Sequence, residues 1–283
     1  MCYAYLADVP GGEIDYYDID STFRRSKWFT RGWTLQELLA PPTVIFYNCV
    51  WVEIGTKKTL ETLVSAITGI EHLFGFEKAS VAQKMSWASK RETLREEDMA
   101  YCLLGLFGIN MPPLYGEGES AFFRLQNEII NVSNDESIFA WVDDTLPNGI
   151  GGLLARSPAV FRDSWNIETY SRFWRSAPYS MTNKGLQICV SLTPRRRTRA
   201  EQIRAMENGT REDSKNNIPY AAFLNCTRRG QPGIVALKMV KTLYTQEEYT
   251  RESCDELITV PTPVLGQSPN EKHIFVRQNQ VYI

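Results

Sequence analysis

The sequence predicts an α/β region followed by a mainly antiparallel β region, with the boundary between residues 142 and 143. Within residues 1–142, short apolar runs alternate with stretches of helical spacing, which is typical of α/β structure. Beyond residue 145, apolar residues recur at every second position, as in strands with one buried face. A stretch rich in Pro and Gly at residues 147–152 indicates a linker or tight turn between the two regions.

The first region begins with a strand, a helix and a second strand. Strands are predicted at Cys2–Leu6 and at Thr43–Tyr47, and the second is β-branched and aromatic enough to be buried on both faces. Between them, the helix Trp33–Ala40 is expected to start at a capping box formed by Thr34 and Glu37 and to end at the two prolines that follow. This order predicts a parallel pair of strands with a right-handed crossover.

Further helices are predicted from apolar residues at helical spacing, over Leu60–Ile67, Met85–Ala88, Met99–Phe107 and Phe122–Ile129. Capping boxes precede the second and third of them, at Ser80–Gln83 and Thr93–Glu96. Gly69 and Gly108 fit the position just past a helix end. Leu104 lies on the apolar face of the third pattern, so we expect it in the core.

The second region carries its clearest alternation at Leu186–Leu192, after a predicted turn at Pro178–Gly185. The other predictions are strands at Tyr220–Asn225 and Ile234–Met239, weaker strands at Val264 and Ile274–Val276, and a helix at Ala200–Asn208. These patterns predict an antiparallel sandwich or an open barrel.

Composition excludes several classes of function. A chain that is 43% hydrophobic and 23% charged is typical of a soluble globular protein, and a net charge of −2 gives no attraction to nucleic acid or anionic membranes. No apolar run is long enough for a membrane span, and the first residues do not resemble a signal peptide. The six cysteines form no C-x-x-C pair, which argues against a metal site and favours free thiols in the cytoplasm. Neither of the two histidines has an obvious nucleophile partner.

Two polar clusters each leave two interpretations open. The turn Tyr115–Glu119 is either a phosphate-binding loop or a structural turn, and its two acids and lack of a G-K-[ST] sequence favour the turn. The cluster Pro194–Arg199 holds four arginines that could contact nucleic acid or acidic lipid. Its lack of interleaved aromatic residues favours a solvated loop.

Several motifs in consistent order resemble the fungal heterokaryon incompatibility (HET) domain, namely Cys2–Val9, Trp33–Glu37, Ser80–Ala88, Glu97–Gly105, Met111–Gly118 and Arg124–Gln126. Together they cover most of residues 1–141. The resemblance implies a fungal intracellular protein that triggers programmed cell death when genetically different cells fuse, with protein partners or self-association. It assigns residues 1–142 to the C-terminal portion of a HET domain and residues 143–283 to a β-rich domain of unknown function.

The HET domain is similar to the TIR family, whose plant members carry a Trp-Cys-Leu-x-Glu-Leu stretch that Trp33–Leu38 matches except at Thr34. The resemblance implies a TIR-like parallel sheet and makes Glu37 the catalytic carboxylate of an NAD-cleaving enzyme. Glu37 would hold the ribose and stabilise the positive charge that develops as nicotinamide leaves. NAD would then be a substrate rather than a bound cofactor. The alternative is that Glu37 only caps the helix.

Two neighbours of Glu37 are candidates for binding NAD. Trp33 could stack on a ring, although a Trp beside a short helix is more often part of the core. Arg31 could hold a phosphate with two hydrogen bonds, although a plain surface arginine is the commoner case.

Complete HET domains have a substantial segment before the Cys-Tyr-Ala-Tyr stretch, so the resemblance implies an N-terminally truncated domain with an exposed sheet edge. Three hypotheses follow: an NAD-cleaving enzyme, a non-enzymatic module that self-associates or binds a partner, and an inactive remnant. An enzyme needs Glu37 to face a cleft, whereas in a module Glu37 can lie on the Thr34 amide.

Overall fold

The computed structural model describes residues 1–12, 15–146, 149–170, 177–199, 201–202, 218–241, 247–261 and 271–278. The chain forms two compact units. Unit 1 comprises Met1–Ala79, Lys84–Leu125 and Ser157–Trp165, and unit 2 comprises Ser80–Gln83, Gln126–Arg156 and Asn166–Ile283. Each unit therefore draws on several separate segments. Whether the predicted boundary between residues 142 and 143 separates two independently folding parts stays a prediction.

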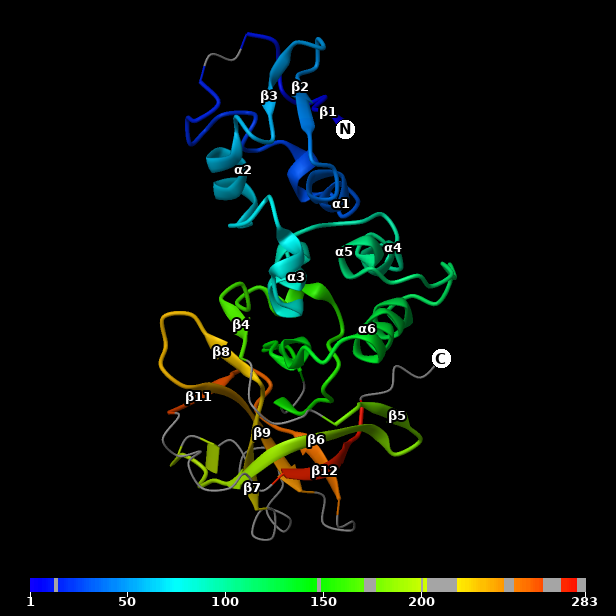
Figure 1. Cartoon of the computed structure of the whole chain (residues 1–283), viewed down its shortest axis with the longest axis vertical. Coiled ribbons are helices and arrows are strands. Elements are labelled where there is room, and N and C mark those ends of the chain that lie inside the picture. Colours follow the sequence, from blue (N-terminus) through cyan, green and yellow to red (C-terminus); the bar gives the residue numbers. More distant parts are fainter. Residues whose placement is uncertain are drawn as a thin grey trace. The chain divides into compact units, whose positions relative to one another are not determined.

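Unit 1 contains a three-stranded sheet in the order β1 (Cys2–Tyr5), β2 (Val44–Tyr47) and β3 (Glu53–Thr56). β1 and β2 pair in parallel, with Cys2 opposite Val44, and β3 joins β2 antiparallel. The 3-10 helix η1 (Lys27–Thr30) and helix α1 (Thr34–Leu39) lie between β1 and β2 in the chain (Figure 1). The predicted strand–helix–strand order is confirmed. The antiparallel strand β3 was missed, and the sheet contains one parallel pair of strands.

One face of this sheet is covered and the other is exposed. Ala4 and Phe46 on the covered face are buried, together with Leu35 and Leu38 of α1, which contacts β1. Phe23 packs edge to face on Phe46, with the ring centroids 5.6 Å apart. Because side chains alternate along a strand, the neighbouring residues of β1 point to the opposite face.

The exposed face carries aromatic side chains. Tyr3 and Tyr5 of β1 are 61% and 39% exposed, and Tyr5 stacks on Trp51 with ring centroids 4.6 Å apart. Tyr47 of β2 lies between Tyr3 and Trp51, with ring centroids 6.1 and 5.8 Å away respectively. β1 is also the end strand of the sheet in the described residues.

The remaining helices are α2 (Glu61–Thr68), α3 (Val81–Ala88), α4 (Asp98–Tyr101), α5 (Leu104–Phe107) and α6 (Ser120–Val132), with a 3-10 turn η2 (Phe76–Lys78). Gly69 and Gly108 end α2 and α5 in the left-handed conformation, as predicted. The capping box before α3 is also confirmed. The Gln83 side chain accepts from the Ser80 amide, and the Ser80 hydroxyl accepts from the Gln83 amide.

Two predictions about these helices are wrong. The pattern from Met99 to Phe107 is two short helices, α4 and α5, rather than one. The break between them shifts the apolar face, so that Leu103 is fully buried while Leu104 is only half-buried. The predicted capping box at Thr93 does not form, because the Thr93 hydroxyl donates to the Arg95 carbonyl and α4 begins only at Asp98.

Unit 2 is built on a closed sheet. Its strands are β4 (Ile167–Thr169), β5 (Ser180–Thr182), β6 (Gly185–Pro194), β7 (Pro219–Phe223), β8 (Cys226–Arg228), β9 (Ile234–Lys241), β10 (Glu248–Arg251), β11 (Ile258–Val260) and β12 (Glu271–Val276). Strands β10, β12, β6, β7 and β9 pair in that order, and β9 pairs again with β10, so these five close into a barrel. Their pairs are antiparallel except β10–β12. The predicted barrel is therefore closed rather than open.

The outlying elements complete unit 2. β5 forms a hairpin with β6, β11 pairs with β9, and β4 pairs with β8 apart from the barrel (Figure 1). The 3-10 helix η3 (Glu136–Phe139) also belongs to unit 2, while η5 (Pro158–Phe161) belongs to unit 1. The predicted strand at Val264 and most of the predicted helix Ala200–Asn208 lie outside the described residues.

Arg251 on β10 is a buried cation that fixes the segment from Phe139 to Trp141, which precedes the barrel strands in the chain. Its guanidinium donates to the carbonyls of Phe139 and Trp141 and lies 3.8 Å from the centroid of the Trp141 ring. The Arg251 backbone also pairs with Gly151 through two hydrogen bonds. The described part of the predicted linker at residues 147–152 is therefore tied to the barrel.

All six cysteines are free thiols, and Cys102, Cys226 and Cys254 are buried. In the described ranges, no three His, Cys, Asp or Glu side chains lie close enough to hold a metal ion. No helix in the same ranges has the length and apolarity needed to cross a bilayer.

Candidate functional site

The predicted site residues lie in helix α1 (Glu37) or just before it (Arg31 and Trp33), and the first residue of the helix, Thr34, is held by a buried arginine. The Thr34 hydroxyl donates to the carbonyls of Trp28 and Arg31 and accepts from Nη1 of Arg91, 3.0 Å away. Arg91 also donates to the carbonyls of Arg31 (2.9 Å) and Trp87 (3.2 Å). Burial lowers the pKa of Arg91 to about 10, so the side chain stays charged at neutral pH.

The middle of α1 is held by Gln36. Its side-chain amide donates to the Cys102 carbonyl, which ties α1 to the turn between α4 and α5. Gly105 leaves room for this contact, because a Cβ there would lie 2.8 Å from the Gln36 oxygen. Gly32 permits a similar close approach, since a Cβ would lie 2.5 Å from the Thr93 methyl group.

The end of α1 is held by Lys57. Its ammonium group donates to the carbonyls of Leu38 (3.0 Å), Leu39 (3.4 Å) and Pro41 (2.7 Å). These carbonyls belong to the last turn of α1 and the residues after it, where a cation is favourable. Burial lowers the pKa of Lys57.

The side chains of Arg31, Trp33 and Glu37, by contrast, are exposed. Among the described residues, these three side chains take part in no hydrogen bond or ion pair. The Glu37 amide bonds to the Trp33 carbonyl, which places Trp33 and Glu37 one turn apart on the same face of the helix. Burial, and then the charge of Glu37, raise the pKa of the Cys2 thiol.

The predicted capping box of α1 is wrong. Trp33 is the residue that precedes the helix, and it makes no side-chain cap. Thr34 is the first residue of the helix, one position after the capping position. Its hydroxyl contacts the carbonyls of Trp28 and Arg31 and the guanidinium of Arg91. The Glu37 carboxylate is therefore not held on the Thr34 amide. The prediction that Trp33 is part of the core is wrong as well, since Trp33 is 40% exposed.

The turn Tyr115–Glu119 holds an internal carboxylate instead of a phosphate. The amides of Gly116 and Gly118 donate to the Glu97 carboxylate at 2.7 and 3.2 Å. Hydrogen bonds from backbone amides, its own and those of the two glycines, lower the pKa of Glu97. The adjacent Glu117 accepts from the Tyr101 hydroxyl (2.7 Å) and pairs with Arg124. This supports the interpretation of a structural turn.

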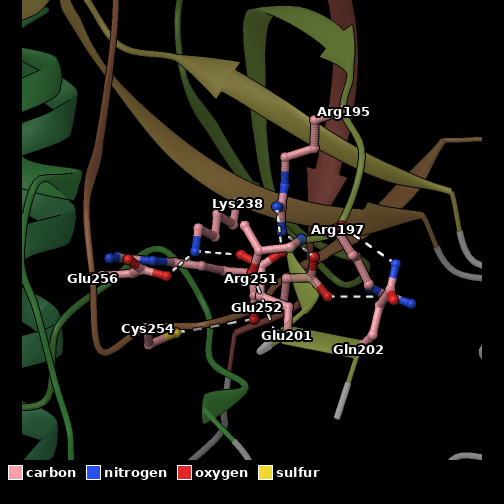
Figure 2. Close-up of polar contacts among 10 residues, drawn as sticks. Arg195, Arg197, Glu201, Gln202, Lys238, Arg251, Glu252, Cys254 and Glu256 are labelled. Carbon is pink, nitrogen blue, oxygen red and sulfur yellow. Dashed lines mark hydrogen bonds and ion pairs between the residues drawn. The ribbon is translucent and has the colours of Figure 1, made fainter. Parts of the chain in front are cut away.

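A second polar cluster lies in unit 2, where the arginine-rich segment folds onto the barrel (Figure 2). Arg195 pairs with Glu201 (2.8 Å) and Glu252 (2.7 Å), and Arg197 pairs with Glu252 (3.1 Å). The interpretation of this segment as a wholly solvated loop is therefore wrong, because the side chain of Arg195 is only 13% exposed.

Lys238 of β9 joins the cluster by pairing with Glu201 and Glu256, and it lies to the left of Arg195 in Figure 2. Burial alone would raise the pKa of Glu201, but hydrogen bonds from Lys238 and Arg195 outweigh it and lower the pKa to about 2. Each of the carboxylates Glu201, Glu252 and Glu256 in the cluster is paired with at least one cation.

Sequence reasoning missed Arg91, Lys57 and Gln36, although these residues set the position of α1. The partners through which they hold α1 and its flanking residues lie 16–66 residues away in the chain, so no local pattern could reveal them.

No family model and no solved structure matches the chain. One curated protein that is similar to it is the vegetative incompatibility protein HET-E-1 of Podospora anserina. The alignment extends over 139 residues, which is 45% of this chain, at 45% identity. The chain spans about a tenth of the length of that relative. Over nearly half of its own length, the chain is thus similar to a fungal vegetative incompatibility protein.

Proposed function

We propose that this chain acts in fungal vegetative incompatibility, as part of the cell-death response to fusion of unlike cells. The similarity to HET-E-1 supports this role, and an identity of 45% is high enough that the two matched regions should share a fold. We assign the action to the exposed face of α1, and we expect the protein to work in the cytoplasm with protein partners and without nucleic acid.

The observation that carries the proposal is the contrast between the two sides of α1. Thr34, Gln36 and the carbonyls at the helix end are fixed by contacts from three other parts of unit 1. The side chains of Trp33 and Glu37 on the other side are exposed. A rigid element that presents free polar and aromatic groups is the usual support of a binding or catalytic site.

The proposed reaction is cleavage of NAD at the bond between ribose and nicotinamide. Glu37 would hold the ribose hydroxyls and stabilise the positive charge on the sugar. Trp33 would stack on a ring of the dinucleotide, and Arg31 would bind a phosphate. The free carboxylate of Glu37 suits this role better than a capping carboxylate would.

A second candidate function is a non-enzymatic binding module. The exposed aromatic face with Tyr3, Tyr5 and Trp51 suits protein–protein contact better than nucleotide binding.

Expression in a filamentous fungus tests the proposal. In one arm the chain is expressed alone, and in the other it is joined in frame to the upstream sequence of its gene. Growth and cellular NAD are measured in both arms. Glu37→Gln keeps the size of the side chain and removes its charge, and Glu53→Gln is the matched control at another exposed glutamate. For the enzyme, growth arrest and NAD loss should disappear with Glu37→Gln and persist with Glu53→Gln.

The other outcomes separate the hypotheses. Growth arrest with unchanged NAD would favour the binding module and reject NAD cleavage. Growth arrest that a folded Glu37→Gln protein retains in full would remove Glu37 from the mechanism. An absence of growth arrest in both arms would contradict the proposed role and leave the inactive remnant.

A further inference from the structure

The cluster in unit 2 surrounds a threonine that has the sequence context of a phosphorylation site. Thr198 follows Arg195, Arg196 and Arg197 directly and is exposed. Many protein kinases select arginine at the third and second positions before the acceptor hydroxyl. Such a motif is common by chance, so the structure around it has to decide.

The contacts of Thr198 place its hydroxyl at the edge of the ion-pair cluster. The Thr198 amide donates to Oε2 of Glu201 at 2.8 Å, and the Glu201 amide donates to the Thr198 hydroxyl at 3.3 Å. The same Glu201 oxygen pairs with Arg195. A phosphate on Thr198 would therefore stand beside one carboxylate and within the reach of two arginines.

Comparison with similar motifs favours Thr198. Three other hydroxyls follow two adjacent basic residues, namely those of Ser26, Thr59 and Thr93. Ser26 is itself buried, and the basic residues Lys57 and Arg91, which precede the other two, are buried with their cations bound to carbonyls. A kinase could not bind those cations without unfolding unit 1.

At Thr198 the basic residues are more accessible. Arg196 is exposed and, within the described residues, makes no ion pair. The side chains of Arg195 and Arg197 are 13% and 15% exposed and pair with Glu201 and Glu252. A kinase that binds these arginines has to break the ion pairs, but it need not break the hydrogen bond from the Arg195 amide to the Pro219 carbonyl.

We propose that Thr198 accepts a phosphoryl group from an arginine-directed protein kinase. We also propose that Arg195 and Arg197 then form ion pairs with the phosphate in place of Glu201 and Glu252. In the reaction a bond forms between Oγ1 of Thr198 and the γ-phosphorus of a nucleoside triphosphate. The bond from that phosphorus to the β–γ bridging oxygen breaks, the diphosphate leaves, and the hydroxyl proton is released.

The direction of the change follows from charge. A phosphate carries nearly two negative charges and three acceptor oxygens, so it binds a guanidinium more strongly than one carboxylate does. It also repels Glu201, whose contact with the Thr198 amide is lost. Glu201 also pairs with Lys238 of strand β9 and so connects the arginine segment to that strand. Phosphorylation thus changes this connection.

The first test is phosphorylation of the folded full chain. The chain is incubated with ATP and the catalytic subunit of cAMP-dependent protein kinase, and the modified residue is located by mass spectrometry. We expect a single phosphate on Thr198, retained in Thr198→Ser and in the control Thr93→Ala, and lost in Thr198→Ala. Arg196→Ala should lower kcat/KM about tenfold, as for one lost charge-assisted hydrogen bond.

A further variant tests whether the ion pairs of Arg195 and Arg197 slow phosphorylation of Thr198. Glu252→Gln removes the ion pairs that Glu252 forms with Arg195 and Arg197, and it should raise kcat/KM of the kinase reaction about twofold to tenfold. A phosphate at Thr93 or Ser26, or a rate for the folded chain no higher than that of Thr198→Ala, would overturn the proposal.

The second test asks whether arginines hold the phosphate. The second pKa of the phosphothreonine is measured by phosphorus NMR in the folded chain and in urea. We expect a lower pKa in the folded chain, and an upward shift with Arg195→Gln. Equal pKa values in the folded and unfolded chains would show that the arginines stay with the glutamates, and would overturn the second half of the proposal.

Discussion

Two residues, Arg91 and Lys57, show how this protein uses buried cations. Their hydrogen-bond partners are backbone carbonyls and one hydroxyl rather than carboxylates. Burial lowers the pKa of both, but the pKa of Arg91 is still about 10. A buried cation with several carbonyl partners fixes the backbone at each of those points, and here the fixed points lie before and after α1.

Arg91→Met should destabilise unit 1 by about 2–4 kcal/mol, because it removes the donor to the Thr34 hydroxyl and one of the two donors to the Arg31 carbonyl. Arg31→Met is the matched control, since that side chain is exposed, and it should change stability by less than about 0.5 kcal/mol. Urea unfolding monitored by tryptophan fluorescence measures both. Equal effects of the two substitutions would contradict the role given to Arg91.

Glu201 should make the stability of unit 2 depend on acid. Its folded pKa of about 2 lies below its ordinary value of 4.5. A depressed pKa contributes stability that is complete above pH 4.5 and is lost as the pH falls toward 2. The free energy of unfolding of the parent chain should therefore exceed that of Glu201→Gln at pH 7, and the difference should shrink between pH 4.5 and 2. A difference that is constant over this range would show that Glu201 is not held by Lys238 and Arg195.

At the scale of elements, the break between α4 and α5 decides which leucine is in the core. Leu103→Ala should destabilise by about 2–5 kcal/mol, as for a fully buried leucine, and Leu104→Ala by about 1 kcal/mol. A sequence read as one continuous helix places both leucines on the apolar face and therefore predicts a loss of about 2–5 kcal/mol at Leu104 as well. Denaturation midpoints of the two variants distinguish the two cases, and an effect at Leu104 as large as that at Leu103 would contradict the break.

Local signals predicted some elements well and others badly, for a physical reason. The capping box at Ser80 and Gln83 formed because both side chains bond to amides within the same turn. The similar pattern at Thr34 and Glu37 failed because Arg91, distant in the chain, offers Thr34 a buried partner. Where a polar side chain faces the core, its distant neighbours decide its bonds.

The same limit applied to the site and to the second region. Glu37 is exposed and its role stays a prediction, and the residues that hold α1 could not be found from sequence. The alternation that predicted β6, β7 and β9 did not reveal the short strand β10, whose pairing with β9 and β12 closes the barrel. Pairs between distant short strands leave no periodic signal.

At the scale of the whole molecule, the extent of unit 2 can be tested with shortened chains. A chain of residues 143–283 lacks Phe139 and Trp141, which bind the buried guanidinium of Arg251. It should be less stable than a chain of residues 126–283 by about 3–5 kcal/mol, the usual cost of leaving a buried cation without its partners. Thermal unfolding followed by circular dichroism compares the two chains. Equal stability would support the boundary between residues 142 and 143 as a true domain limit.

The buried thiols give each unit its own reporter of opening. Burial raises the pKa of Cys102 in unit 1 to about 12, and burial also raises the pKa of Cys254 in unit 2. An alkylating reagent reacts with the exposed thiolate, so neither sulfur can react at neutral pH until its surroundings open. The alkylation rates at Cys102 and Cys254 therefore measure the opening equilibria of the two units within the unmodified chain. A denaturant series would show whether these equilibria rise together or separately.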